Sequence, residues 1–273
     1  MQVGISTASF FAKCAVEDTP DRIKRCGASL AEAFLNTFSE YQKDFIDLLS
    51  QRFCENGITI YSLHPMGPQF EPQLFSIHSR QRQDALRIYE EVLDAAKRLG
   101  ARYYIMHGPA SMHGTVKNME FSRIGPIVKE LCETALSYGI TLAWENVSWC
   151  LFHWPDFALR LTDAAKTEAL HFTLDLKQAA RSGFEPQAYI AAIGKCGAGR
   201  LANVHVCDYA KEQGRVRPAL PGKGQCDFRA VRLALNEIQY TGPAFLEVYS
   251  DLYDTDEELS QSYQYIMQQL CGK

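Results

Sequence analysis

Six residues able to bind a metal or move a proton recur along this chain, each at the end of a short apolar segment. They are His64, His107, Glu145, Asp175, His205 and Glu247. Any one of them could serve a structural purpose, as a histidine bonded to a loop carbonyl or as an acid that caps a helix. Their shared position after successive apolar segments indicates instead that they belong to one site.

Four of these residues form a ligand set for one divalent metal, namely Glu145, Asp175, His205 and Glu247. Three carboxylates and one imidazole offer mainly hard oxygen ligands with one nitrogen, which suits Mn²⁺, Mg²⁺ or Co²⁺. Zn²⁺ competes because it binds most such sites tightly. We predict one bound metal, with Mn²⁺ first and Zn²⁺, Co²⁺ or Mg²⁺ as alternatives. Carboxylates around a metal-bound sugar could also remove and return a proton next to its carbonyl.

The apolar segments that precede these residues predict the strands that position them. Eight segments lie at residues 2–6, 31–36, 58–63, 101–106, 140–144, 169–174, 200–206 and 243–248. Segments with helical spacing separate them, most clearly residues 80–99, and Gly57, Gly100 and Gly139 stand where helices are expected to end.

Eight strands alternating with helices predict one (β/α)₈ TIM barrel of the α/β class over residues 1–273, with its active site at the C-terminal rim. An open parallel sheet is the alternative, although no G-x-G-x-x-G motif follows the first strand to favour a dinucleotide-binding fold.

The composition narrows the classes of function. The chain is 47% hydrophobic and 22% charged, as in soluble globular proteins, and its net charge of −4 gives no overall positive field. We therefore expect a small-molecule substrate and no nucleic acid partner.

No export signal and no apolar run of about 18 residues is visible, so we expect a cytoplasmic protein with no membrane partner. The nine cysteines form no C-x-x-C pair and are expected to be reduced. Assembly into a homo-oligomer is left open.

The sequence resembles the xylose isomerase-like barrel superfamily, which includes sugar phosphate isomerases and epimerases, ketose 3-epimerases, inosose dehydratase and endonuclease IV. The resemblance spans nearly the whole chain and rests on the order and spacing of short motifs. These are Trp144-Glu145-Asn146, Asp175 with Ala179 and Gly183, Val204-His205-Val206-Cys207-Asp208, Pro221-Gly222-Lys223-Gly224 with Asp227-Phe228, and Leu246-Glu247.

The resemblance implies roles for the six residues. Glu145, Asp175, His205 and Glu247 would hold the metal shared by the superfamily, with Glu145 and Glu247 as the catalytic acid and base. The histidines His64 and His107 would face the substrate, as in the isomerases, or bind a second metal, as in the nuclease.

The chain departs from the superfamily pattern at two places. Gln178 replaces the histidine that the superfamily usually has three residues after the aspartate that corresponds to Asp175, and residues 217–220 contain no histidine. The ligands for a third metal of the nuclease type are therefore missing. Gln178 is expected to contact the sugar, because an amide can donate and accept hydrogen bonds to a hydroxyl.

Further residues are assigned to substrate binding from their positions. Trp144 opens a segment, 144–154, that carries three tryptophans and could form an aromatic wall over a sugar. Phe10 and Phe11 could complete it. A set of basic residues in loops could bind a phosphate, namely Lys177, Arg181, Lys211, Arg217 and Lys223. Asp208 is expected to orient His205 or Lys211.

These observations predict a divalent-metal-dependent isomerase or epimerase that acts on a sugar or sugar phosphate by proton transfer through a metal-stabilised enediolate. A metal-dependent lyase or dehydratase, which starts with the same proton abstraction, is the alternative. An endonuclease IV-like hydrolase is a further one.

Overall fold

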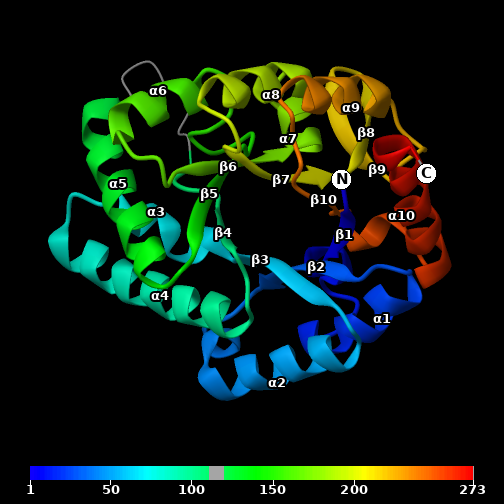
Figure 1. Cartoon of the computed structure of the whole chain (residues 1–273), viewed down its shortest axis with the longest axis horizontal. Helices are drawn as coiled ribbons and strands as arrows, with labels where there is room; N and C mark the ends of the chain where they lie inside the picture. The colour runs from blue at the N-terminus through cyan, green and yellow to red at the C-terminus, as the bar shows by residue number, and fades with distance from the viewer. Residues whose placement is uncertain (111–119, 273) are drawn as a thin grey trace.

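A computed structural model describes residues 1–110 and 120–272 and shows a closed barrel of parallel strands inside a ring of helices (Figure 1). The strands follow the barrel in the order β1-β10-β7-β6-β5-β4-β3-β2. Their bounds are β1 Val3–Ser6, β2 Leu30–Leu35, β3 Thr59–Pro65, β4 Tyr103–Met106, β5 Thr141–Glu145, β6 His171–Asp175, β7 Leu201–Val206 and β10 Ala244–Leu246. Each overlaps one predicted segment, so the (β/α)₈ prediction is confirmed and the open sheet is excluded.

Helices cover the outside of the barrel. They are α1 Thr19–Arg25, α2 Lys43–Glu55, α3 Glu71–Leu74, α4 Ser79–Arg98, α5 Phe121–Ser137, α6 Phe157–Ala165, α7 Leu176–Arg181, α8 Pro186–Lys195, α9 Phe228–Glu237 and α10 Asp256–Cys271. Short 3₁₀ turns lie at Thr7–Phe10, Val16–Asp18, Phe38–Tyr41, Gly67–Gln69 and Ser250–Leu252. In α4, for example, Tyr89, Val92, Leu93 and Ala96 are fully buried against the barrel, as the three-and-four spacing predicts.

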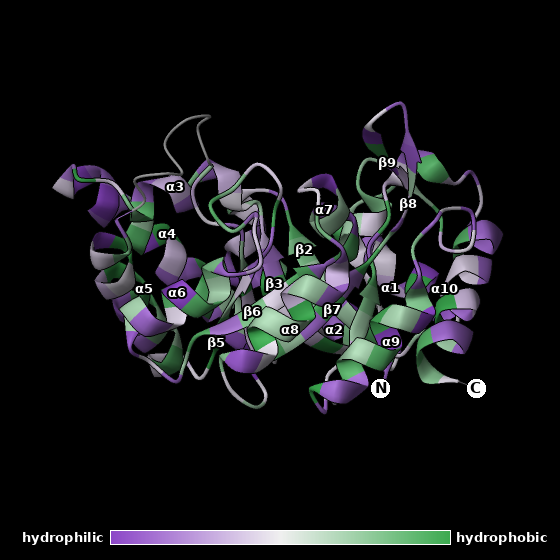
Figure 2. Ribbon diagram, turned by 90° about the horizontal axis from the view of Figure 1, so that it is seen from above, coloured by the Kyte–Doolittle hydropathy of each residue, from purple (hydrophilic) through white to green (hydrophobic). Residues whose placement is uncertain are grey.

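A β-hairpin that the strand pattern did not predict extends the rim. It consists of β8 Asp208–Glu212 and β9 Arg215–Ala219, paired antiparallel. Its two-residue turn, Gln213-Gly214, has positive φ at both positions, as such tight hairpins require. Figure 2 shows this hairpin at the end of the barrel opposite to the two chain termini. Its residues are mostly polar, so no apolar alternation marked it.

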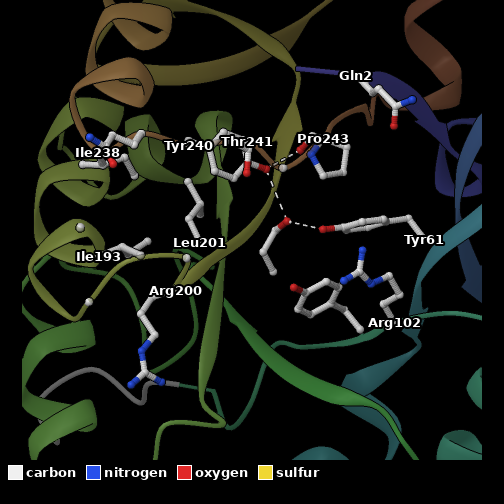
Figure 3. Close-up of a pocket in the computed structure, with 17 residues that line it drawn as sticks. Gln2, Tyr61, Arg102, Ile193, Arg200, Leu201, Ile238, Tyr240, Thr241 and Pro243 are labelled. Atoms are coloured by element: carbon white, nitrogen blue, oxygen red, sulfur yellow. Dashed lines mark hydrogen bonds between the residues drawn. The ribbon is translucent and has the colours of Figure 1, made fainter.

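Tyr61 and Tyr240 are among the residues that line a cavity at the N-terminal end of the barrel (Figure 3). The hydroxyl of Tyr61 donates to the carbonyl of Ala202 at 3.0 Å, and that of Tyr240 donates to the carbonyl of Pro243 at 2.6 Å. A cavity of about 350 Å³ lies here, and the residues that line it include no carboxylate and no histidine. The described residues that line this cavity therefore do not include the acid, base and ligand groups that the sequence pointed to.

Two further expectations concern the chain as a whole. All nine cysteines are free, as predicted. Within residues 1–110 and 120–272, no helix combines the length and the apolar character needed to cross a bilayer.

One carboxylate links the first and last helices. Asp256, at the start of α10, accepts hydrogen bonds from Arg22 Nε and from Arg25 Nη2, each at 2.9 Å. The hydrogen bond from Arg22 is the main cause that lowers the pKa of the Asp256 carboxyl below its ordinary value. A carboxyl with a lowered folded-state pKa stabilises the fold above its unfolded pKa, and this stability is lost as the pH falls through the folded value.

We therefore predict that Asp256→Asn lowers the free energy of unfolding by about 1 kcal/mol at pH 7. The difference from wild type should narrow as the pH falls below about 4. Urea denaturation of both proteins from pH 7 to pH 3 measures this. Asp84→Asn, which removes a pair in which both partners are largely exposed, is the matched control and should change stability less. A gap for Asp256→Asn that is independent of pH would contradict the account.

Candidate active site

The carboxyl ends of four strands bring together the predicted ligand set. Glu145 ends β5, Asp175 ends β6, His205 lies near the end of β7, and Glu247 follows β10. Each of the four offers a ligand atom, and these atoms all lie within 4.8 Å of one another. Parallel pairing produces this, because Asp175 pairs with His205 and the Glu247 amide donates to the carbonyl of Val206. The structure therefore places these residues at one point.

His205 lies at the centre of this cluster and is fully buried. Its Nδ1 is 3.2 Å from Glu145 Oε1 and 3.1 Å from Glu247 Oε2. Its Nε2 is 3.0 Å from the carboxylate of Glu32. Two carboxylates therefore meet one ring nitrogen and a third meets the other.

Glu32, which the sequence reasoning missed, holds the back of His205. It is fully buried within β2 and also accepts hydrogen bonds from Ser62 Oγ at 2.7 Å and Asn203 Nδ2 at 2.9 Å. A carboxylate behind the second ring nitrogen fixes the orientation of a metal-binding histidine. The only sequence signal was a glutamate inside the apolar segment 31–36, where a charge is unfavourable unless it has partners.

Buried oxygens that form no hydrogen bond show that the four-residue cluster suits a cation. Among the described residues, the buried Glu145 Oε2 and Glu247 Oε2 form no hydrogen bond, although a histidine nitrogen lies 3.1 Å from each. Asp175 Oδ1 accepts from the amide of Gln178 at 2.7 Å, whereas Oδ2 faces the ammonium of Lys177 at 3.3 Å. Buried carboxylate oxygens without hydrogen bonds are costly. A divalent ion among these oxygens would remove that cost, so the residues fit the predicted metal.

The pKa shifts within the cluster also indicate that it suits a cation. Burial opposes ionisation of Glu145, yet His205 and His107 lower the pKa of its carboxyl well below the ordinary value. Burial also opposes charging of His205, but Glu247, Glu32 and Glu145 raise its pKa well above the ordinary value. Burial and the neighbouring Glu145 raise the pKa of Glu247, although His205 opposes them. In the protein alone, a proton on His205 thus supplies positive charge that a metal ion could replace.

His64 and His107 form a pair on the neighbouring strand ends. Their Nε2 atoms are 2.9 Å apart, and His107 Nε2 is 3.1 Å from Glu145 Oε2. Both rings line the cavity above the cluster, and neither Nδ1 atom forms a hydrogen bond within the described part of the chain. These two histidines form a second possible ligand group with Glu145, and His64 forms a third with Glu32 and Glu247.

A second buried glutamate that the sequence reasoning missed fixes the backbone at His107. Glu71, at the start of α3, accepts from the amides of His107 at 2.9 Å and Gly108 at 2.8 Å, and from the Tyr104 hydroxyl at 2.8 Å. Three donors around one carboxylate hold this turn in a single position.

Gln178 and its neighbours shape one side of the cavity. Gln178 Oε1 accepts from Ser148 Oγ at 2.7 Å, so its amide nitrogen is the end left for a ligand. Asn146 pairs with the backbone of Asp175 through both ends of its amide, at 2.7 and 3.0 Å, and extends the link between β5 and β6. The predicted substrate-binding Gln178 does line the cavity.

The cavity has a volume of about 250 Å³, and its outer part is mainly apolar. Phe11, Phe34, Met66 and Trp149 contribute to this wall, and Trp149 is 45% exposed. Phe10, by contrast, is fully buried.

Trp144 is not part of the cavity wall, although the sequence placed it against the substrate. It is fully buried, and its Nε1 donates to the carbonyl of His107 at 3.0 Å. Gly108 makes room for its ring, because a Cβ there would lie 2.3 Å from Trp144. Side chains alternate along a strand, so Trp144 points outward to the helices while Glu145 points into the barrel mouth.

Two predictions about the hairpin region need correction. Lys211 lies on β8 and pairs with Glu185 at 2.8 Å, outside the cavity lining. Asp208 orients neither His205 nor Lys211. Its carboxylate instead accepts from backbone amides of a loop, those of Tyr209, Gly222, Gly224 and Cys226.

The closed α/β barrel and the carboxylate and histidine cluster at the carboxyl ends of its strands can be compared with known protein families. The model of the family described as xylose isomerase-like TIM barrel matches residues 20–269, and the chain belongs to this family. A comparison with curated proteins gives no match.

Solved structures share the fold. The IolI protein with a bound zinc atom superposes with a TM-score of 0.83 at 18% identity, covering 100% of this chain and 99% of that one. D-psicose 3-epimerase from Clostridium cellulolyticum H10, solved with D-tagatose, gives 0.78 at 17%, covering 99% of each chain. The 3-keto-D-glucoside 4-epimerase YcjR from E. coli gives 0.76 at 15%, covering 98% of this chain and 99% of that one.

Proposed function

We propose that this protein is a divalent-metal-dependent isomerase or epimerase of a sugar or sugar phosphate. The observation that carries the proposal is the convergence of ligand atoms of Glu145, Asp175, His205 and Glu247 within 4.8 Å at the base of a cavity. Two of their buried oxygens form no hydrogen bond with the described residues. Membership of the family and the likeness to sugar epimerases support it.

The metal would be held by the four residues of this cluster. When bound, it would polarise a carbonyl or hydroxyl of the sugar and stabilise the charge that develops on proton removal. Mn²⁺ is our first candidate, and the zinc described in the IolI structure makes Zn²⁺ the main alternative.

Glu145 and Glu247 would exchange a proton with the sugar. In the barrel, β5 and β10 are separated by β6 and β7, so the two carboxylates approach the cavity from different sides. One would take the proton from the carbon next to the carbonyl, and the other would deliver a proton either to the opposite face of that carbon or, with a proton passing between the two enediolate oxygens, to the neighbouring carbon. The first outcome is epimerisation and the second is isomerisation.

The other cavity residues would position the sugar. His64 and His107 offer ring nitrogens to hydroxyl groups, and the free amide nitrogen of Gln178 donates to another. Trp149 and Phe34 present aromatic rings that suit the C–H face of a sugar. The small volume favours a monosaccharide, because pockets for drug-sized ligands span about 300 to 1,000 Å³.

A lyase or dehydratase is the second candidate. The paired histidines lie next to Glu145, where one of them could protonate a departing hydroxyl after the same proton abstraction. A structural neighbour described as a probable 3-DHS dehydratase shares the fold, with a TM-score of 0.76 at 11% identity.

Replacing a proposed acid or base should stop proton exchange. We predict that Glu247→Gln lowers the rate at which a substrate proton exchanges with D₂O by at least about 100-fold, since general acid–base catalysis contributes about 10²–10⁴-fold. The measurement is deuterium incorporation by mass spectrometry over a panel of ketoses and their phosphates, with the metal content of each variant determined in parallel. A Glu247→Gln protein that keeps both its metal and full exchange would remove Glu247 from the mechanism.

Removing the support behind His205 should weaken metal binding without removing a ligand. We predict that Glu32→Gln lowers the affinity for Mn²⁺ or Zn²⁺ about 10- to 100-fold, the usual effect of losing such a partner. Titration with a competing chelator measures this affinity. Glu71→Gln is the matched control, because Glu71 is equally buried but does not contact His205. Equal losses in the two variants would show that Glu32 has no specific role.

A further inference from the structure

A buried lysine faces the cavity beside the proposed metal ligands. Lys177 lies in the first turn of α7, its side chain is 3% exposed, and it lines the cavity. Lysine is almost never buried unless its charge is paired. The groups around its ammonium therefore decide what it does.

The pairing of Lys177 inside the protein is incomplete. Its Nζ lies 3.3 Å from Asp175 Oδ2 and 4.5 Å from the centre of the Tyr249 ring. Among the residues that the structure describes, no other carboxylate comes within ion-pair distance, and none accepts a hydrogen bond from it. Asp175 also belongs to the metal cluster, so its charge would be shared with the ion. The ammonium thus keeps donors for a further negative group.

A second cation, Arg181, contacts Tyr249, which lines the cavity. Arg181 lies one turn after Lys177, and its Nη1 donates to the Tyr249 hydroxyl at 2.9 Å. Its guanidinium carbon lies 5.6 Å from the centre of the Tyr249 ring. In the described part of the chain, Arg181 has no ion pair with a carboxylate. Both cations therefore contact Tyr249.

We propose that Lys177 binds an anionic oxygen group of the substrate, so that the substrate class is an acidic sugar, a carboxylate or a phosphate, rather than a neutral ketose. This inference rests on the proposed function, because it takes the cavity to be the sugar site. Lys177 lies next to Asp175, so it suits a carboxylate close to the reacting carbons. A phosphate at the far end of a sugar would reach Arg181 as well.

The test compares D-fructose with two acidic ligands: 2-keto-D-gluconate, whose carboxylate lies next to the keto carbon, and D-fructose 6-phosphate, whose phosphate lies at the far end of the sugar. Their dissociation constants are measured by calorimetry with the metal-loaded wild type, Lys177→Met and Arg181→Gln. Lys211→Met is the matched control, since Lys211 lies outside the cavity lining. Metal content is determined for every variant.

We expect wild type and Lys211→Met to bind at least one acidic ligand at least tenfold more tightly than D-fructose. Lys177→Met should lose this preference while its metal content and its affinity for D-fructose stay unchanged. Arg181→Gln should reduce the preference only if the favoured ligand is the phosphate.

Three results would overturn the inference. They are the absence of a preference in wild type, a preference that survives in Lys177→Met, and a loss of metal or of D-fructose binding in Lys177→Met as large as the loss of the acidic ligand. The last would show that Lys177 only balances the carboxylates. Deuterium exchange distinguishes a failure of this inference from a failure of the proposed function. If neutral ketoses exchange and the protein shows no preference for acidic ligands, only the inference is contradicted. If acidic ligands are preferred but no sugar exchanges, only the proposed isomerase function is contradicted.

Discussion

Concentrated negative charge at one end of the barrel is the constraint on which the rest of this structure depends. Glu32, Glu145, Asp175 and Glu247 point toward His205 from different strands, and all but Glu247 are almost fully buried. Carboxylates at such distances repel one another strongly when water is excluded. Their positions are stable only if cations and hydrogen-bond donors are held among them, and the neighbouring residues supply both.

Two groups of side chains balance this negative charge, a back layer behind His205 and a front layer that faces the cavity. At the back, Ser62 and Asn203 donate to Glu32, which in turn holds His205. At the front, Lys177 faces Asp175 Oδ2, and imidazole nitrogens face Glu145 Oε2 and Glu247 Oε2. A divalent ion would complete the charge balance. The barrel strands fix the back layer, so the front layer is presented to the cavity with little freedom to relax. Such preorganisation is what acid–base chemistry on a bound sugar requires.

The sequence alone supported the barrel because eight apolar segments recurred between helical ones, and it supported the cluster because parallel strands place their carboxyl ends together. It could not reveal Glu32 and Glu71, whose importance comes from partners distant in the chain, such as His205 and the amide of Gly108. The hairpin at 208–219 escaped notice because strand pairing there depends on a tight turn rather than on apolar alternation.

The direction in which a side chain points also could not be predicted from the sequence. The sequence pointed to Trp144 as the aromatic contact for a sugar, but the ring faces the helices, and Trp149 lies at the cavity instead. Likewise Lys211 appeared equal to Lys177 as a basic loop residue, whereas only Lys177 turns into the cavity. These differences depend on where each strand ends and each helix begins, to within one residue.

The most direct test of the metal site is an anomalous difference map from crystals of this protein grown with Mn²⁺ and measured near the manganese absorption edge. The account predicts one strong peak bonded to Glu145, Asp175, His205 and Glu247. The absence of any peak, or a peak only between His64 and His107 or only beside Glu32, would contradict it.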